Sequence, residues 1–360
     1  MLKLIFNKDI GDKWLFILPL LLSTFGLLMI FNASSVAALK DFSDKFYYFK
    51  HQLAWLAIGI VLFLTFSIFD YRLLKKFAFL AFFLNIILLI IVLFPSVGKQ
   101  IYGGRRWLDF GGFTIQPSEF IKLSFIVYLS TLFEKRRNFF VFLSLIGVIL
   151  LLLILEPDLG TASIITVSAF AVYFISGCSL KEITFTAILG LIAGPLTILT
   201  SPYRKNRLLT FLNSTFDTSG ISYHIRQILI ALGSGGIFGR GLGQSRQKFL
   251  FLPEVTTDSI FAVIAEEFGF LGSLVLIFAF IFLIFRGFES SIIIKDKFGQ
   301  MLSAGIMFIL GLQTIVNLGA MVALIPMTGV PLPFISYGGS SLMVSLAEMG
   351  IVYNISKSHK

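Results

Sequence analysis

One aspartate, Asp258, stands where a polar segment meets an apolar stretch of membrane-spanning length. At such a boundary the apolar side disfavours the charged form of a carboxylate, while water and a substrate can still reach it. This combination suits a general base. The same position also suits the N-cap of the helix that would follow. From the residues alone, both interpretations of Asp258 stay open.

A glycine-rich, basic run precedes this aspartate, with the sequence GSGGIFGRGLGQSRQK at 233–248. Its six glycines would let the backbone approach a ligand closely. Arg240, Arg246 and Lys248 stand among or beside them and would suit a phosphate or pyrophosphate. The run is neither a P-loop nor a dinucleotide fingerprint, because it lacks G-K-[ST] and no strand is expected before it. A flexible loop with solvated charges is the alternative.

Other charged residues lie within or beside apolar segments, where a charge is costly and therefore a candidate for function. Glu119 and Lys122 are three residues apart, on one face of an expected helix, where they can pair. The alternative is that such residues pair with arginines of the outer loop and lock helices together. The remaining candidates are Glu156, Asp158, Glu266, Glu267 and Glu348.

A proline-rich segment, IPMTGVPLPFISYGGSS at 325–341, contains Ser336 and Gly338. Dense prolines prevent a continuous helix. At membrane depth such a segment must be covered by protein or line a cavity, so it predicts a rigid wall of a substrate groove or a structural plug. The three histidines are too scattered for a zinc site, and the single cysteine, Cys178, cannot form an internal disulfide.

The composition shows which elements must carry these residues. Of 360 residues 57% are apolar and 13% charged, whereas soluble domains carry about 25% charged residues. A soluble enzyme is therefore excluded, and the apolar residues suffice for roughly ten spans of about 20 residues each. We expect an all-α integral membrane protein, one domain over 1–360, with a long extracytoplasmic loop at 201–257. The ten apolar segments are 14–32, 51–69, 77–94, 120–133, 139–155, 161–176, 183–199, 260–285, 301–322 and 341–355.

The distribution of positive charge orients these spans. Ten spans place both termini on one side, and that side would hold 15 of the 29 Lys and Arg residues. Seven of the other 14 lie in the long segment 201–257, which weighs less in the positive-inside rule. Without that segment, the side of the termini carries 15 basic residues and the other side carries 7, which predicts that both termini are cytoplasmic. The net charge of +10 therefore reflects topology rather than a nucleic-acid partner.

Four segments together resemble the SEDS family (shape, elongation, division and sporulation). They occur in the order and at the spacing typical of that family, and the resemblance covers nearly the whole chain. Within the family, GLGQSRQK followed by FLPE favours the FtsW branch over the RodA branch. The segments are RRWLDFGGFTIQPSEFIK at 105–122, EPDLGT at 156–161, the run from 233 to 269, and TGVPLPFISYGGSS at 328–341.

The resemblance implies a peptidoglycan glycosyltransferase in the bacterial cytoplasmic membrane. Such an enzyme polymerises lipid II, the undecaprenyl-pyrophosphate-linked disaccharide-pentapeptide, on the outer membrane face with inversion at the anomeric carbon, for division or elongation. It implies that Asp258 is the essential catalytic aspartate. We expect substrate binding by Glu119, Lys122, Arg106, Arg240, Arg246, Lys248, Ser336 and Gly338, and supporting roles for Glu156, Asp158, Glu266 and Glu267.

The resemblance also implies partners. These are lipid II, a class B penicillin-binding protein that supplies transpeptidation, and membrane proteins of the division or elongation machinery. No tightly bound cofactor is expected, and a divalent cation, Mg²⁺ or Mn²⁺, is left open. The alternative function is a transporter that flips lipid II without glycosyl transfer.

Overall fold

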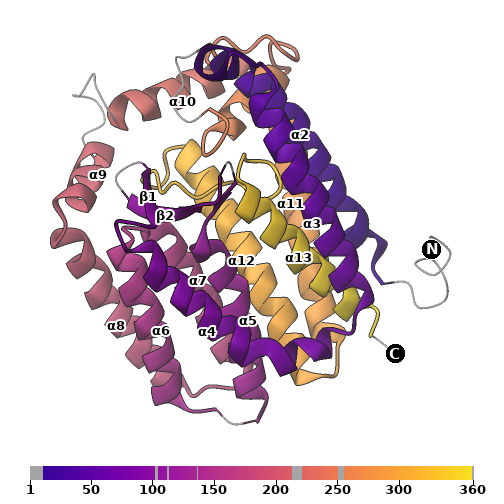
Figure 1. The fold of residues 1–360 in the computed structure, drawn as a ribbon, viewed down its shortest axis with the longest axis vertical. Coiled ribbons are helices and arrows are strands. Elements are labelled where there is room, and N and C mark those ends of the chain that lie inside the picture. The colour runs from indigo at the N-terminus through magenta and orange to yellow at the C-terminus, as the bar shows by residue number, and fades with distance from the viewer. Residues whose placement is uncertain are drawn as a thin grey trace.

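The computed structural model describes residues 11–101, 104–111, 113–135, 137–212, 221–249 and 255–358. Each of the ten expected apolar segments coincides with one helix (Figure 1). The FLPE segment at 251–254, His359 and four of the basic residues counted for topology (Lys3, Lys8, Arg136 and Lys360) lie outside the described residues. The ten helices are α2 (Lys13–Phe42), α3 (Tyr47–Ile68), α4 (Leu74–Val92), α5 (Pro117–Lys135), α6 (Phe139–Leu155), α7 (Leu159–Ile175), α8 (Leu180–Leu199), α11 (Ile260–Ile293), α12 (Lys297–Met321) and α13 (Gly339–Ser356).

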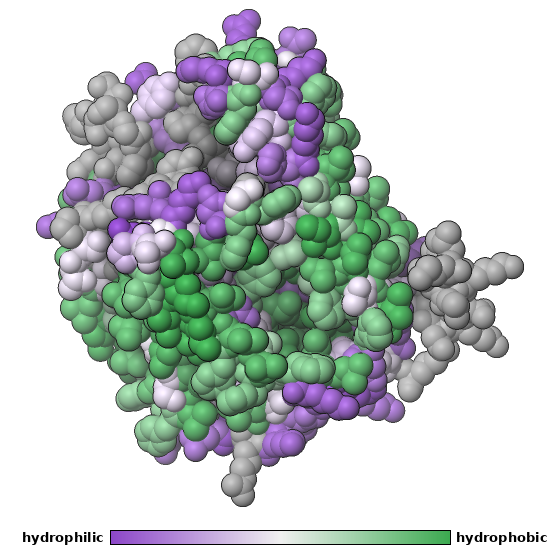
Figure 2. All heavy atoms as spheres, in the orientation of Figure 1, coloured by the Kyte–Doolittle hydropathy of each residue, from purple (hydrophilic) through white to green (hydrophobic). Residues whose placement is uncertain are grey.

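On the face shown in Figure 2 an apolar band crosses the middle of the bundle, and hydrophilic side chains gather at its two ends. Within the described residues, six helices are long and apolar enough to cross a membrane, one of them α4 together with the short 3₁₀ helix η1 (Tyr71–Leu73). Helices α6 and α7 are apolar but have 17 residues each. The all-α membrane fold is thus confirmed, while the count of ten spans stays a prediction.

Two features differ from the expected fold. Between α4 and α5 the chain forms a small antiparallel sheet of β1 (Gly98–Ile101), β2 (Gly104–Asp109) and β3 (Thr114–Ile115), in the order β1-β2-β3. The segment 201–257 is not simply a loop, because it contains α9 (Pro202–Leu212) and α10 (Ile221–Gly235). Helix α10 is amphipathic and buries Ile225, Ile228 and Ala231 at helical spacing.

The core of the bundle is α13, whose residues from Ser340 to Ser356 are all buried. It packs against α3, where a Cβ on Gly350 would lie 2.5 Å from the carbonyl oxygen of Phe63, so only glycine permits this approach. At the far end of α13, the hydroxyl of Ser356 accepts a hydrogen bond of 3.0 Å from the backbone of Asp12. The start of α2 and the end of α13 therefore lie at the same end of the bundle, as an even number of spans requires.

Helix α11 is broken at Gly269, where φ is 70° and ψ is −166°. The glycine-rich turn inserts at this break: the backbone N–H groups of Arg240 and Gly241 donate to the carbonyls of Glu266 and Glu267, each at 3.0 Å. A Cβ on Gly269 would lie 2.2 Å from the backbone nitrogen of Gly239. The glycines therefore let two backbones touch. We call residues 235–249 the glycine clamp.

Replacing Gly269 by alanine should destabilise the protein. The backbone conformation at Gly269 is essentially restricted to glycine and costs other residues about 1–3 kcal/mol, to which the clash with Gly239 adds. Gly190 in α8 is the control, because a Cβ there meets no atom within 4 Å and alanine favours a helix. In detergent, Gly269→Ala should melt several degrees lower and Gly190→Ala should not; equal melting temperatures would contradict the clamp.

Candidate functional site

A cavity of about 120 Å³ lies at the end of the bundle where α11 and α13 begin. Strand β2, α9 and the proline-rich segment meet around it. Asp258 is the only carboxylate among its described lining residues, and it shares the cavity with two guanidinium groups, those of Arg106 and Arg207. The lining consists of Arg106, Trp107, Gln116, Arg207, Thr257, Asp258, Thr328, Gly329, Pro331, Tyr337, Gly338, Ser340 and Ser341.

Side-chain hydrogen bonds to the backbone at Thr257 and Asp258 hold Asp258 in this wall. Its carbonyl accepts a hydrogen bond of 3.1 Å from Asn317 Nδ2, and the preceding carbonyl, of Thr257, accepts one of 2.7 Å from Ser336 Oγ. The N-cap position of α11 is Ser259, whose side chain makes no capping hydrogen bond. Asp258 therefore stands one residue before the N-cap position of this helix. Gly329 keeps the space in front of the carboxylate open, since a Cβ there would lie 3.5 Å from Asp258 Oδ2.

Arg106 ties the sheet to the turn between α6 and α7. Its Nε donates to the carbonyl of Glu156 at 2.9 Å, and its Nη2 donates to the carbonyl of Pro157. Asp158 accepts from the backbone and the hydroxyl of Thr161, at 3.1 and 2.9 Å, and so caps α7. This EPD turn therefore supports the cavity wall through Arg106 and does not line the cavity.

The Glu156 carboxyl is fully buried, and neither of its oxygens has a hydrogen-bond partner among the described residues. Burial and, to a lesser extent, the charge of Asp158 outweigh the opposing charge of Arg106 and raise its pKa to about 9. Glu156 is therefore protonated at neutral pH. Tyr337, which lines the cavity, has its pKa raised to about 12 mainly by burial, so its phenol stays a hydrogen-bond donor.

Glu119 and Lys122 lie next to the cavity wall rather than in it. They form an ion pair of 2.9 Å in which each side chain is 3% exposed. Lys122 Nζ also donates to Gln313 Oε1 at 2.8 Å, and Gln313 Nε2 donates to the carbonyl of Pro331 at 3.0 Å. Because Pro331 lines the cavity, the ion pair supports the wall through Gln313.

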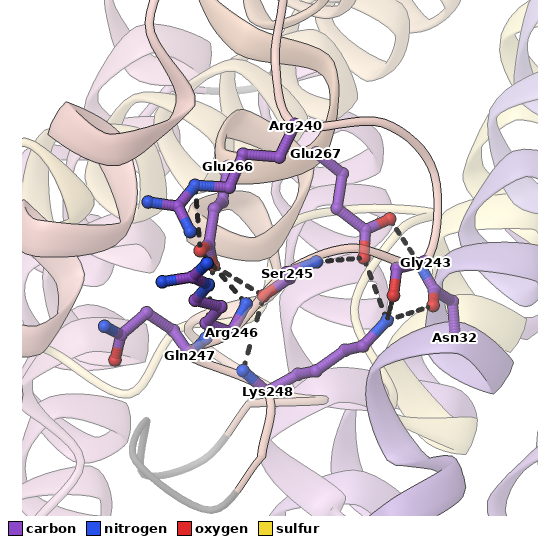
Figure 3. A network of polar contacts seen from close by, with 9 residues as sticks. All are labelled: Asn32, Arg240, Gly243, Ser245, Arg246, Gln247, Lys248, Glu266 and Glu267. Carbon is purple, nitrogen blue, oxygen red and sulfur yellow. Dashed lines mark hydrogen bonds and ion pairs between the residues drawn. The ribbon is translucent and has the colours of Figure 1, made fainter.

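The three cations of the glycine-rich run lie elsewhere (Figure 3). Lys248 Nζ donates to Glu267 Oε1 at 3.0 Å and to Asn32 Oδ1 at 2.7 Å, and it is buried. Arg240 Nε lies 3.7 Å from Glu266 Oε1, and the same oxygen accepts from the backbone of Arg246 at 3.0 Å. None of the three cations lines the cavity.

The reason for this placement is electrostatic. Glu266 and Glu267 are each 1% exposed in an apolar helix, and a buried charge without a partner is strongly destabilising. The glycine clamp supplies cations and backbone N–H groups to both carboxylates. Spacing alone did not show that Glu266 and Glu267 would bind the glycine-rich run. The predicted phosphate site at Arg240, Arg246 and Lys248 therefore did not include these contacts.

Of the two remaining residues predicted to bind substrate, Gly338 and Ser336, only one lines the cavity. Gly338 lines the cavity, and its N–H donates to Gln52 Oε1 at 3.2 Å. Ser336 does not line it, because its hydroxyl binds the Thr257 carbonyl and accepts from the backbone of Leu332. Arg207 lines the cavity although its sequence position gives no signal, because it is one of several cations in the long segment.

A second cavity, of about 250 Å³, adjoins the first and shares Arg207 and Thr328 with it. Arg207 Nη1 donates to the carbonyl of Met327 at 3.1 Å, which places the guanidinium between the two spaces. The second cavity is mainly apolar, with Leu159, Gly160, Leu208, Ile325, Pro326 and Met327 among its lining residues. A polar chamber with a carboxylate thus adjoins an apolar one, with an arginine at their boundary.

Comparisons with known proteins identify relatives over nearly the whole chain. A family model described as cell cycle protein, labelled with the names FtsW, RodA and SpoVE, matches residues 12–360. Stage V sporulation protein E of Bacillus subtilis (strain 168) is 38% identical, with 98% of each chain covered. A probable peptidoglycan glycosyltransferase FtsW of Coxiella burnetii (strain RSA 493 / Nine Mile phase I) is 39% identical, with 96% of this chain and 95% of the relative covered.

Two solved structures share the fold. The rod shape determining protein RodA of Thermus thermophilus matches with a TM-score of 0.71 and 27% identity, covering 96% of each chain. A chain from a structure described as "Structural coordination of polymerization and crosslinking by a peptidoglycan synthase complex" matches with a TM-score of 0.79 and 27% identity, covering 97% of this chain and 98% of that one. The likeness therefore extends over the whole bundle.

Substitutions at Lys248 separate a structural from a substrate-binding role. Lys248→Met leaves Glu267 buried without its cation and should cost about 3–5 kcal/mol, whereas adding Glu267→Gln removes the charge and should restore most of the melting temperature. The double variant should keep the KM for the substrate. A KM raised tenfold in a stable double variant would instead place Lys248 on the substrate.

The buried Glu156 predicts a pH effect on stability. The unfolded chain releases this proton near its ordinary pKa of 4.5, while the folded protein holds it to about 9. Unfolding therefore releases a proton in this window, and the Glu156 contribution to the free energy of unfolding falls as pH rises through it. Glu156→Gln should remove that part of the pH dependence. Parallel melting-temperature profiles for both proteins between about pH 5 and 9 would contradict the assignment.

Proposed function

The chain belongs to the FtsW, RodA and SpoVE family of cell cycle proteins, and from that premise we propose that it is a peptidoglycan glycosyltransferase. Its reaction would join lipid II units into glycan strands on the outer face of the cytoplasmic membrane. The names of its curated relatives support this activity. The observation that carries the proposal is the cavity in which Asp258, Arg106 and Arg207 meet.

The two adjoining cavities fit the chemistry of a lipid-linked sugar diphosphate. Such a substrate has a polar sugar, a doubly charged diphosphate and an apolar prenyl chain. Arg207 stands at the boundary between the polar and the apolar cavity, where its guanidinium would bind the diphosphate. The sugar would then lie beside Asp258, and the first prenyl units would enter the apolar cavity.

In the proposed reaction Asp258 acts as the general base. Its carboxylate takes the proton of the 4-hydroxyl of the acceptor GlcNAc as that oxygen attacks the anomeric carbon of the donor MurNAc. The bond from this carbon to the diphosphate breaks, and attack from the opposite face inverts the carbon from α to β. Undecaprenyl diphosphate departs with the bonding electrons, and Arg106 and Arg207 stabilise its developing charge.

A divalent cation would fit this site only with help from the substrate. Within the described part of the chain, no three His, Cys, Asp or Glu side chains gather to hold a metal. The cavity itself offers the single carboxylate of Asp258. Mg²⁺ is often held by one or two carboxylates together with substrate phosphates, so the diphosphate would supply most ligands. A cation there would neutralise charge on the leaving group.

The partner in this proposal is a class B penicillin-binding protein, which would cross-link the strands that this chain polymerises. The support is the likeness, over almost its full length, to a chain of a synthase complex described as coordinating polymerization and crosslinking. Co-purification of the two proteins from co-expressing cells checks this partnership.

Replacing the base tests the proposed function. Asp258→Asn keeps the size of the side chain but cannot take a proton, so polymerisation of purified lipid II in detergent should fall by at least about 100-fold. Asp296→Asn is the matched control, because Asp296 caps α12 and asparagine caps a helix equally well. Wild-type polymer formation by Asp258→Asn would refute the proposed role of Asp258. Polymer formed by the wild-type protein in detergent, where there is no membrane to cross, requires an enzyme and excludes a flippase without glycosyl transfer.

A further inference from the structure

Two side-chain amides on one face of α12, those of Gln313 and Asn317, donate hydrogen bonds to backbone carbonyls of cavity-lining residues. We propose that Asn317 is a positioning residue that fixes Asp258 relative to the proline-rich wall, and that Gln313 braces the same wall. This inference rests on the proposed function, because it concerns the placement of the proposed base.

Asn317 joins the Asp258 backbone to the proline-rich segment through its side-chain NH₂ group. Its Nδ2 donates to the carbonyl of Asp258 at 3.1 Å and to the carbonyl of Val330 at 2.8 Å. The side chain is 1% exposed. Because both neighbours are carbonyl oxygens, only the amide NH₂ can satisfy them. One NH₂ group therefore sets the separation of the Asp258 backbone from the proline-rich segment.

Gln313 repeats this arrangement one helical turn away. Its Nε2 donates to the carbonyl of Pro331 and, at 3.3 Å, to Ser341 Oγ, and both residues line the cavity. Its Oε1 accepts from Lys122 Nζ, whose partner is Glu119. The ion pair thereby fixes the orientation of the Gln313 amide, with its NH₂ toward the wall. This gives the intramembrane pair a role that needs no contact with substrate.

The wall depends on these amides because it has little regular structure. Val330 and Pro331 lie in a segment without helix or strand, and proline has no N–H to donate. Away from water, their carbonyls need partners from elsewhere. On the other side, α11 begins at Ile260 without a side-chain cap. A shift of about 1 Å at a reacting group can cost 100-fold in rate, so loosening Asn317 should act mainly on kcat.

The rival explanation is that Asn317 only satisfies buried carbonyls. The chain offers a control for this at the other end of α13. Asn354 is also buried; its Nδ2 donates to the carbonyl of Ser67 at 2.9 Å, and its Oδ1 accepts from the backbone of Tyr71 at 3.2 Å. It makes as many hydrogen bonds as Asn317, far from the cavity.

The experiment compares alanine and leucine at both positions, since leucine preserves volume and removes only the polar groups. Melting temperature in detergent and the kcat and KM of lipid II polymerisation are measured for each full-length variant. Asn317→Ala and Asn317→Leu should lower kcat about 10- to 100-fold with KM within about threefold. Asn354→Ala and Asn354→Leu should keep kcat within about threefold at a similar loss of melting temperature.

Wild-type kcat in a folded Asn317 variant would overturn the proposal, as would an equal kcat loss at both positions. If neither Asn317 variant is recovered folded while both Asn354 variants are, the amide is a requirement of folding and the proposal also fails. Asp258→Asn is run in the same assay. An inactive Asp258→Asn beside a fully active Asn317→Leu rejects positioning alone, whereas an active Asp258→Asn rejects the proposed base itself.

Discussion

The rest of the structure depends on neutralising two carboxylates buried in α11, Glu266 and Glu267. Away from water an unpartnered charge is prohibitively costly. Asn32, which bonds both Lys248 and Glu267, follows Lys13 at the start of α2 by 19 residues, or about 28 Å of helix. That is close to the thickness of the hydrocarbon core. This length predicts that the glycine clamp meets α11 near the membrane boundary, and its backbone hydrogen bonds join α11 on both sides of the break at Gly269.

This constraint gives a use to part of the positive charge that the predicted orientation places on the outer side. Part of that charge is used within the fold: Lys248 is buried against Glu267, and Arg240 faces Glu266. Arg106 and Arg207 line the cavity instead. The same principle operates deeper in the bundle, where the pair of Glu119 and Lys122 orients Gln313. In both places an ion pair inside the membrane domain holds polar groups whose hydrogen bonds water does not supply.

Much of the fold could be predicted, because apolar length is a strong signal: each of the ten predicted segments coincides with a helix. The motif segments also identified Asp258, Arg106 and Gly338, which share one cavity. Arg207 and Asn317 were missed, because their roles depend on where α9 and α12 pack. The contacts of the glycine-rich run could not be predicted for a related reason: a cation beside glycines suits a phosphate and a buried carboxylate equally, and only tertiary contacts show that Lys248 lies against Glu267. The phosphate site at this run stays a prediction.

The site that binds the diphosphate is tested most directly by a structure of this protein with a non-reactive lipid II analogue, such as a phosphonate in place of the sugar phosphate. We predict that the diphosphate lies against Arg207 and Arg106, that the sugar faces Asp258, and that the glycine clamp is unchanged. A diphosphate bound by Arg240, Arg246 and Lys248, with the Lys248–Glu267 pair broken, would contradict it.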